Sequence, residues 1–336
     1  MQPAILWKPI KGQDIQCELC SHFCYLKPEQ TGKCGVRINH KGRLYTLVKD
    51  KIAAIHLDPV EKKPLFHFLP GTTTLSIGTM GCNFDCVFCQ NHALSQAPKL
   101  KQAIVGQNIS SQELIEMAIK YQAKSISYTY SEPTIFLELV LETARLSKEK
   151  NLKNIIVSNG FQSQPCLQEL KNYIDAANID LKSFQEEFYR KYCDAHLKPI
   201  LKNLETIKKM GWWLEITTLI IPKLNDSNKE LQQIASFIKK HLGKDVPWHI
   251  SRYHPSYKLS NPPTPLSTLE KAYEIGKETG LEYVYIGNLP GHHTESTFCP
   301  NCQKVVIKRY GFQIQEYNLE QGKCKNCQTQ IAGVFA

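Results

Sequence analysis

Long apolar runs are absent from this 336-residue chain, and no stretch approaches the roughly 18 residues that a membrane-spanning helix needs. Residues 1–17 also lack the apolar stretch and the small-residue cleavage site of a signal peptide. The sequence contains neither an internal repeat nor a long low-complexity tract. These absences argue against a helical membrane span and against secretion, and they predict a cytoplasmic protein without membrane contact.

The chain is basic overall, but no segment concentrates the charge. It has 41 Lys and Arg residues against 31 Asp and Glu residues, which leaves a net charge of +10. A basic surface could bind nucleic acid, an acidic partner or a negatively charged electron donor. The lysines are scattered in short pairs such as Lys62-Lys63 and Lys208-Lys209. We therefore expect a solvated basic surface, and a nucleic-acid partner is not favoured.

Thirteen cysteines are present, and without a signal peptide they indicate metal binding rather than disulfides. Eleven of them form three groups: Cys17, Cys20, Cys24 and Cys34; Cys82, Cys86 and Cys89; and Cys299, Cys302, Cys324 and Cys327. A group of four can complete the coordination sphere of a metal, whereas a group of three leaves one position open. The remaining two, Cys166 and Cys193, are most simply small buried apolar residues.

Between about residues 75 and 290, short β-rich runs alternate with helical runs. The expected strands are Thr74–Thr79, Ser125–Tyr130, Asn154–Ser158, Ala176–Leu181, Leu214–Ile221, Trp248–Tyr253 and Tyr283–Ile286, and expected helices include Ser111–Tyr121, Ile135–Lys150 and Asn228–His241. This alternation predicts an α/β fold, a partial (β/α)6-type barrel with a parallel sheet and helices outside it. The chemistry of such a fold is expected at the carboxyl ends of the strands.

The two ends of the chain do not follow this pattern. We expect residues 1–70 to form a four-cysteine module in which Arg43–Val48 and Ile52–Leu57 pair as a hairpin. Residues 71–290 would form the barrel. Residues 291–336, with a β-rich run at Val305–Tyr317, would form a zinc-ribbon-like module.

The three-cysteine group has the spacing C-x3-C-x2-C and directly follows the first expected barrel strand. Iron–sulfur clusters are held by cysteine thiolates, normally four for a [4Fe–4S] cluster, so three leave one iron open. The amino and carboxylate groups of S-adenosylmethionine can fill that place, and Phe88 lies where an adenine ring could pack. The alternative is a structural zinc site that a distant ligand completes.

The two groups of four suggest closed metal sites. Two C-x2-C pairs separated by 21 residues make Cys299, Cys302, Cys324 and Cys327 resemble a structural zinc ribbon. The group Cys17, Cys20, Cys24 and Cys34 fits either structural zinc or an auxiliary iron–sulfur cluster. His22 lies inside this motif and could replace one of its cysteines.

Several further segments complete a family resemblance. They are Cys17–Cys24, Pro59–Leu65, Tyr130–Pro133, Ile179–Lys182 and Thr218–Pro222, together with the cluster loop Gly78–Asn91 and the C-terminal cysteine pairs. The loop resembles the signature of the radical S-adenosylmethionine (SAM) superfamily. From about residue 17 onward the chain resembles the radical SAM enzymes of the AmmeMemoRadiSam system, which are relatives of the pyruvate formate-lyase activating enzymes.

The resemblance implies an activating-type oxidoreductase with a radical SAM barrel. Such an enzyme would cleave SAM reductively at a [4Fe–4S] cluster on Cys82, Cys86 and Cys89, and the resulting 5′-deoxyadenosyl radical would abstract hydrogen from a substrate. A low-potential electron donor and proteins of the Memo and AMMECR types are the implied partners. The alternatives are a glycyl-radical enzyme activase and, from another class, a zinc-dependent nucleic-acid-binding or adaptor protein.

Polar residues at the strand ends are the candidates for holding the cofactor. Ser131 and Glu132 match the position at which members of the superfamily hold the methionine ammonium group, often with Gly-Gly-Glu; the alternative is a helix start, of which these residues are also typical. The pairs Ser158-Asn159 and Asp180/Lys182 could also contact the cofactor, or they could form an ordinary turn and an ion pair.

Two later strands carry candidates of the same ambiguous kind. Glu215 and Thr217 lie on the fifth expected strand, and His249, Arg252 and His254 surround the end of the sixth.

Overall fold

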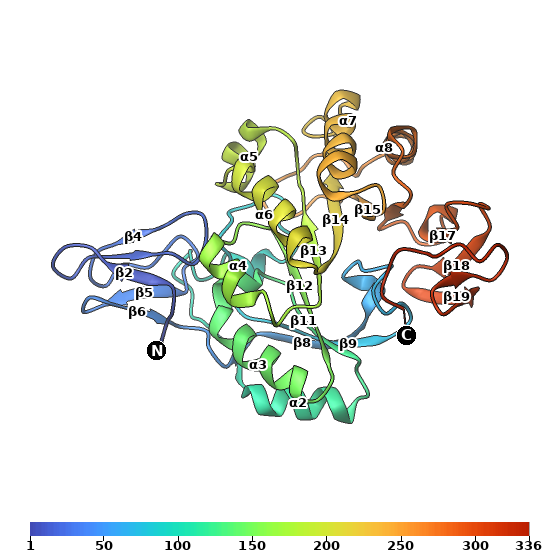
Figure 1. Ribbon diagram of the computed structural model, residues 1–336. Helices are drawn as coiled ribbons and strands as arrows, with labels where there is room; N and C mark the ends of the chain where they lie inside the picture. The colour runs from blue at the N-terminus through green and yellow to red at the C-terminus, as the bar shows by residue number, and fades with distance from the viewer. Residues whose placement is uncertain (336) are drawn as a thin grey trace.

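A computed structural model describes residues 1–335 and shows an open, mostly parallel barrel with a small β-rich module at each end (Figure 1). Within these residues the central sheet has eight strands in the order β16-β15-β14-β13-β12-β11-β9-β8. Its parallel strands are β9 (Thr73–Gly78), β11 (Ser125–Tyr128), β12 (Lys153–Ser158), β13 (Ala176–Asp180), β14 (Trp213–Ile220), β15 (Trp248–Arg252) and β16 (Val284–Gly287). The predicted partial (β/α) barrel and its seven expected strands are therefore confirmed.

Helices cover the outside of this sheet (Figure 1). They are α2 (Ser111–Lys120), α3 (Leu137–Glu149), α4 (Gln164–Leu170), α5 (Glu186–Cys193), α6 (Leu197–Met210), α7 (Asn228–Phe237) and α8 (Leu266–Thr279). Helix α2 begins at a capping box, in which the Ser110 side chain accepts from the amide of Glu113 and Glu113 accepts from the amide of Ser110. Helix α3 begins later than predicted because the 3-10 turn η2 (Pro133–Phe136) precedes it.

The predicted N-terminal hairpin is wrong. Strand β6 (Arg43–Thr46) pairs with β5 (Arg37–His40) and β1 (Gln2–Pro3). The second expected partner is divided: β7 (Lys51–Ile52) pairs with β10 (Gln107–Asn108), and β8 (Ala54–Pro59) pairs antiparallel with β9. Strand β8 covers an edge of the barrel sheet whose backbone groups would otherwise be unpaired, which outweighs pairing with its neighbour in sequence.

Strand β8 thus belongs to the barrel sheet although it precedes residue 71. The division of the chain at residues 70 and 290 remains a prediction. A second small sheet in the N-terminal module contains β2 (Trp7–Pro9), β3 (Ile15–Cys17) and β4 (Tyr25–Leu26).

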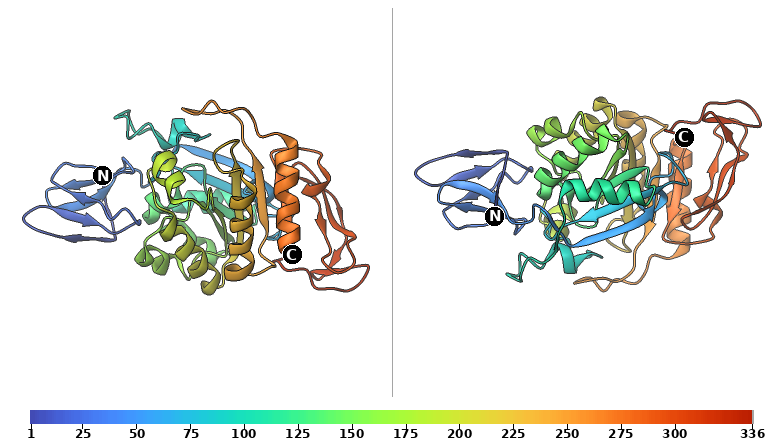
Figure 2. Two further views of the ribbon diagram at one scale, coloured as in Figure 1. Left: turned by 90° about the horizontal axis from the view of Figure 1, so that it is seen from above. Right: turned by 90° about the horizontal axis from the view of Figure 1, so that it is seen from below.

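The C-terminal module forms an antiparallel sheet of β17 (Thr297–Phe298), β18 (Val305–Tyr310) and β19 (Gln313–Tyr317), followed by β20 (Leu319–Glu320) and β21 (Lys323–Cys324). The two modules lie at opposite ends of the barrel (Figure 2). The Arg309 guanidinium lies over the Phe66 ring, 4.3 Å from its centroid, and donates to the Phe66 carbonyl at 2.8 Å. This contact attaches the C-terminal sheet to the segment that precedes β9.

His67 joins the same interface as a neutral imidazole. Its Nδ1 donates to the Ala332 carbonyl at 2.6 Å, so Nε2 accepts from the Tyr285 hydroxyl at 2.5 Å. Burial lowers the pKa of His67 from 6.5 to about 4. The folded protein therefore binds fewer protons here than the unfolded chain does between these two values.

We expect His67 to make the protein sensitive to acid. Its contribution to stability is fully present above pH 6.5 and is lost as the pH falls toward 4, by about 3 kcal/mol. A His67→Gln variant keeps a donor and an acceptor but cannot titrate. Urea unfolding at pH 7, 6, 5 and 4 should therefore show a shallower loss of stability in the variant, and parallel curves for the two proteins would contradict this role.

The structure also bears on the membrane question. Among the helices of residues 1–335, none is long and apolar enough to cross a membrane.

Candidate active site

The three-cysteine loop begins directly after β9, at the carboxyl end of the barrel strands. Cys82 and Cys86 are buried, and Cys89 is partly exposed. Gly81 turns the chain into this loop with a φ of +100°, which favours glycine. A Cβ atom at this position would lie 2.7 Å from Val36 Cγ1 and 2.9 Å from the Cys34 carbonyl oxygen. The loop therefore needs a glycine here because the N-terminal module packs against it.

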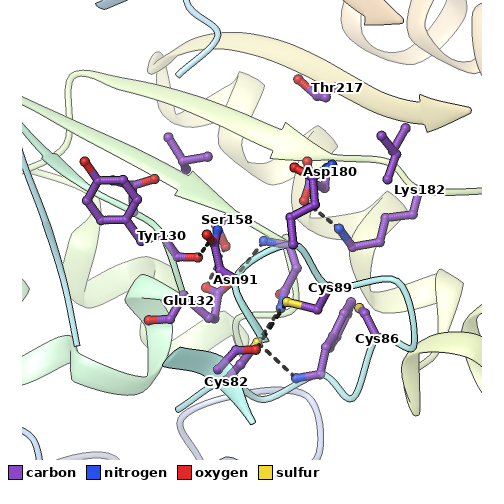
Figure 3. A pocket seen from close by; sticks show the side chains of 18 of the residues that line it. Cys82, Cys86, Cys89, Asn91, Tyr130, Glu132, Ser158, Asp180, Lys182 and Thr217 are labelled. Carbon is purple, nitrogen blue, oxygen red and sulfur yellow. Dashed lines mark hydrogen bonds and ion pairs between the residues drawn. The ribbon is translucent and has the colours of Figure 1, made fainter. Parts of the chain in front are cut away.

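A cavity of about 520 Å³ opens above the loop (Figure 3). Its lining contains the cysteines of the loop and the cofactor candidates at the first four strand ends: Cys82, Cys86, Cys89, Phe88, Ser131, Glu132, Ser158, Asn159, Asp180 and Lys182. These residues come from four successive strand ends, which parallel strands bring to one edge of the sheet. The structure thus brings them together, and their individual roles remain predictions.

Glu132 is a buried carboxylate held in one orientation by its neighbours. One oxygen accepts from the Ser158 hydroxyl at 2.7 Å and from the backbone amide of Thr134 at 3.1 Å. The other oxygen accepts from the backbone amide of Asn159 at 2.8 Å. Burial raises the pKa of Glu132 despite these bonds. Glu132 therefore caps the 3-10 turn η2, which agrees with the predicted helix start, and it also lines the cavity.

Ser131 and Asn159 are also held by specific contacts. The Ser131 hydroxyl donates to the Thr79 carbonyl at 2.7 Å, which links the end of β11 to the end of β9. The side-chain Nδ2 of Asn159 donates to Oδ1 of Asn83 at 2.7 Å, and Asn83 immediately follows Cys82. Both contacts connect strand ends to the cysteine loop.

Asp180 and Lys182 form an ion pair in the cavity wall, with Lys182 Nζ 2.6 Å from Asp180 Oδ2. Burial disfavours the charge of Lys182, but Asp180 and Cys86 outweigh it and hold the pKa of Lys182 well above its usual range. The ammonium group also lies 5.9 Å from the centroid of the Phe88 ring. Asp180 and Lys182 therefore form an ion pair with each other and also line the cavity, although the sequence alone left these as alternatives.

A charged group beside the cavity was not identified from the sequence. Asp58 accepts from Lys62 Nζ at 2.9 Å, from Lys63 Nζ at 2.6 Å and from the Tyr130 hydroxyl at 2.7 Å. Lys62, Lys63 and Tyr130 line the cavity. The sequence shows Lys62-Lys63 as one of several scattered lysine pairs. It does not indicate that Asp58 is their ion-pair partner.

Phe312 is a second residue that sequence reasoning missed. It lies in the turn between β18 and β19 and lines the cavity, so the C-terminal module contributes to the site. Nothing in the local sequence indicates this contact, because it depends on how the module docks on the barrel.

Glu215 has a structural role instead. Its carboxylate accepts from the amides of Phe66 at 3.0 Å and His67 at 2.8 Å, and from His249 Nε2 at 2.6 Å. Thr217 lines the cavity, whereas the lining described for residues 1–335 does not include Glu215, His249, Arg252 or His254. Of the ambiguous candidates on these two strands, only Thr217 reaches the site.

The C-terminal cysteines form a compact group in which the four sulfur atoms lie within 4.8 Å of one another. Cys299 and Cys327 have their sulfurs 3.5 Å apart, and Cys302 and Cys324 have theirs 3.7 Å apart. A tetrahedral ion with metal–sulfur bonds of about 2.3 Å would place its ligands about 3.8 Å apart. Hydrogen bonding between Cys327 and Thr329 lowers the pKa of Cys327 to about 6, which favours a thiolate. This group could therefore hold a single metal ion.

Comparison with known proteins agrees with this geometry. The family model described as the Radical SAM superfamily matches residues 76–238. An uncharacterized protein of Methanocaldococcus jannaschii is 41% identical over 334 residues, which cover 98% of this chain and 99% of that protein. The 4-hydroxyphenylacetate decarboxylase activating enzyme of Clostridium scatologenes is 25% identical over 197 residues, 58% of this chain and 60% of that enzyme.

Among solved structures, a radical SAM methyltransferase from Sphaerobacter thermophilus shares the fold with a TM-score of 0.51 and 14% identity, over 66% of this chain and 68% of that one. Further relatives carry names of glycyl-radical enzyme activating enzymes, including a pyruvate formate-lyase-activating enzyme of Clostridium pasteurianum. The chain therefore belongs to the radical SAM superfamily, whose enzymes use a [4Fe–4S] cluster and S-adenosylmethionine.

Proposed function

We propose that this protein binds a [4Fe–4S] cluster through Cys82, Cys86 and Cys89 and cleaves SAM to generate a radical that abstracts hydrogen from its substrate. The observation that carries the proposal is the shared cavity, which contains a three-thiol group and a ring of polar side chains at the strand ends. When bound, the reduced cluster supplies the electron that splits SAM into methionine and a 5′-deoxyadenosyl radical.

The spacing of the thiols supports a cluster rather than a zinc ion. Among residues 1–335, only the C-terminal group brings its sulfur atoms within 4.8 Å of one another. The sulfurs of Cys82, Cys86 and Cys89 are more widely spread than a single tetrahedral ion requires. A polynuclear cluster accommodates this spread, because each thiolate binds a different iron.

The surrounding side chains fit the polar and aromatic parts of SAM. Glu132, which neighbouring donors hold in place, provides a carboxylate for the methionine ammonium group. The polar groups of Ser158 and Asn159 suit the ribose or the carboxylate, and Phe88 offers an aromatic face for the adenine. Asp180 and Lys182 contact either the cofactor or the substrate. The buried walls limit the access of water to the reactive centre.

The finer assignment is an enzyme of the AmmeMemoRadiSam type, with Memo-type and AMMECR-type proteins and a low-potential electron donor as partners. It is supported by the resemblance of the chain along Pro59–Leu65, Tyr130–Pro133 and the terminal cysteine groups. We propose zinc as the metal of the C-terminal group, because the sulfur spacing there fits one tetrahedral ion.

A glycyl-radical enzyme activase is the second candidate, and the names of several relatives favour it. This enzyme would abstract hydrogen from a backbone glycine of a partner protein. The sequence Tyr-Ser-Glu-Pro at residues 130–133, in place of Gly-Gly-Glu, argues against a direct transfer of that function.

The test is anaerobic reconstitution with iron and sulfide, followed by addition of SAM with and without dithionite. We expect 5′-deoxyadenosine, measured by liquid chromatography and mass spectrometry, only in the reduced sample. A Glu132→Gln variant should retain its iron but bind SAM more weakly in equilibrium dialysis. A fully reconstituted wild-type protein that forms no 5′-deoxyadenosine would overturn the proposal.

A separate incubation distinguishes the two enzyme candidates. A glycyl-radical protein is added to the reduced enzyme and SAM, and its glycine-centred doublet is sought by electron paramagnetic resonance. A doublet would favour the activase. Formation of 5′-deoxyadenosine without a doublet would favour another substrate.

A further inference from the structure

The N-terminal cysteine segment contacts the barrel through backbone pairing. Cys20 forms an antiparallel bridge with Gln162, in the loop that follows β12. The amide of Ser21 donates to the Phe161 carbonyl at 3.0 Å, and the amide of Ser163 donates to the Leu19 carbonyl at 3.2 Å. The first two cysteines of the motif are thereby anchored to the barrel beside the active-site strand ends.

The four thiols Cys17, Cys20, Cys24 and Cys34 form one largely buried group. Burial raises the pKa of Cys20 well above its usual range, and the nearby thiols of Cys17, Cys24 and Cys34 raise it further. Three of the four residues are buried, and all four are free thiols. Four neighbouring and unbridged thiols, three of them buried, are a suitable ligand set for a metal site.

The spacing of these thiols differs from that of the C-terminal group. Within residues 1–335, no three of the N-terminal sulfurs lie within 4.8 Å of one another, whereas all four C-terminal sulfurs do. A single tetrahedral zinc ion would need about 3.8 Å between them. In the described residues, the three sulfurs of the cluster loop likewise do not all lie within 4.8 Å of one another. The N-terminal group therefore resembles the cluster loop and not the compact C-terminal site.

A buried cation lies next to these thiols. Arg37 is 1% exposed, and its positive charge opposes the effect of burial on the pKa of Cys17 and Cys34. Its terminal nitrogens bind Glu138 and the Ile5 carbonyl, but its Nε has no hydrogen-bond partner in the described part of the chain. A metal cluster held by four thiolates carries negative charge, which a neighbouring arginine offsets.

The N-terminal group contacts the active-site loop on both sides of Cys82. His22 Nε2 lies 2.8 Å from the Asn83 carbonyl oxygen, directly after Cys82. The Cys34 carbonyl packs against Gly81, directly before Cys82. A path from Cys20 to Cys82 therefore runs along the backbone to His22, through the His22 side chain and its hydrogen bond to the Asn83 carbonyl, and along the backbone to Cys82.

We propose that Cys17, Cys20, Cys24 and Cys34 bind a second iron–sulfur cluster, which is the entry point for electrons that reach the active site. Its role, although not its existence, rests on the proposed function. A low-potential donor protein of the ferredoxin or flavodoxin class reduces this cluster by one electron. The cluster is reoxidised when that electron passes toward Cys82 through the His22–Asn83 contact, and no bond forms or breaks.

The test uses the full-length chain with Cys82, Cys86 and Cys89 all changed to alanine, which leaves only the flanking groups. After anaerobic reconstitution we expect about four iron and four sulfide per chain, and an iron–sulfur signal in electron paramagnetic resonance after reduction. Adding Cys20→Ser and Cys34→Ser should remove the iron and the signal. Retention of the C-terminal metal and an unchanged circular dichroism spectrum show that this variant is folded.

Zinc in place of iron and sulfide at the N-terminal group would overturn the proposal, as would a chain that binds neither. Because no SAM is present, this result does not depend on whether the protein cleaves SAM. The role is tested with His22→Phe, which keeps an aromatic ring against Phe161. This variant should bind as much iron as the wild type but show slower reduction of the active-site cluster by reduced ferredoxin in stopped-flow absorbance. Unchanged reduction would contradict the electron path.

Discussion

A Cys86→Ala variant is expected to form no detectable 5′-deoxyadenosine under conditions in which the wild type does. The loop supplies only three thiols, and two cannot retain a [4Fe–4S] cluster, so the iron content should fall by about four per chain. Cys86 is buried within the cavity lining, and its loss leaves the strand ends intact. Iron analysis and product chromatography on the same reconstituted sample measure both effects.

Cys193 provides a matched control. A hydrogen bond with the Cys193 thiol raises the pKa of Cys86, so the two sulfurs are neighbours. Cys193 is fully buried and lies outside the cavity lining of the described chain. A Cys193→Ala variant should therefore retain both iron and product formation. If it lost its iron as well, Cys193 would be a fourth ligand and the open coordination position would not exist.

Replacing Asp58 with Asn is expected to destabilise the fold by about 3–5 kcal/mol at pH 7. Asp58 is 4% exposed and balances the ammonium group of Lys63, whose side chain is 2% exposed. Without the carboxylate, a buried positive charge is left unpaired. Urea unfolding measures the loss. The double variant Asp58→Asn with Lys63→Met should recover most of it, because no buried charge then remains.

The pH dependence gives an independent check on this ion pair. Burial lowers the pKa of Lys63 to about 8 even with Asp58 beside it, and without Asp58 it falls further. Below pH 8 the variant therefore sheds this proton on folding while the wild type keeps it. Stability rises with pH wherever the unfolded state binds more protons than the folded state. The difference in free energy of unfolding between the wild type and the Asp58→Asn variant therefore becomes smaller as the pH rises toward 8. A difference that stays constant with pH would contradict an unpaired Lys63 charge as the cause.

The sequence by itself determined the barrel strands and the position of the three-cysteine loop. Each parallel strand is mostly buried on both faces and reads as a short β-rich run, so its location depends on local composition. Because the carboxyl ends of parallel strands meet at one edge, the polar residues after the first four parallel strands share one site. The C-terminal cysteine pairs were equally clear, since two C-x2-C turns brought together by a short β-segment are sufficient to surround one ion.

Only the tertiary structure decided which distant segments complete the site and the sheet. Strand β8 pairs with β9, at the edge of the parallel strands, and not in the expected hairpin. The Glu215 carboxylate accepts hydrogen bonds from the backbone amides of Phe66 and His67. Lys63 and Phe312 reach the cavity from segments far from it in sequence. These outcomes depend on unpaired sheet edges, buried charges and the docking of modules. Each of these depends on the free energy of contacts between residues far apart in the sequence. A local pattern of residues therefore cannot predict them.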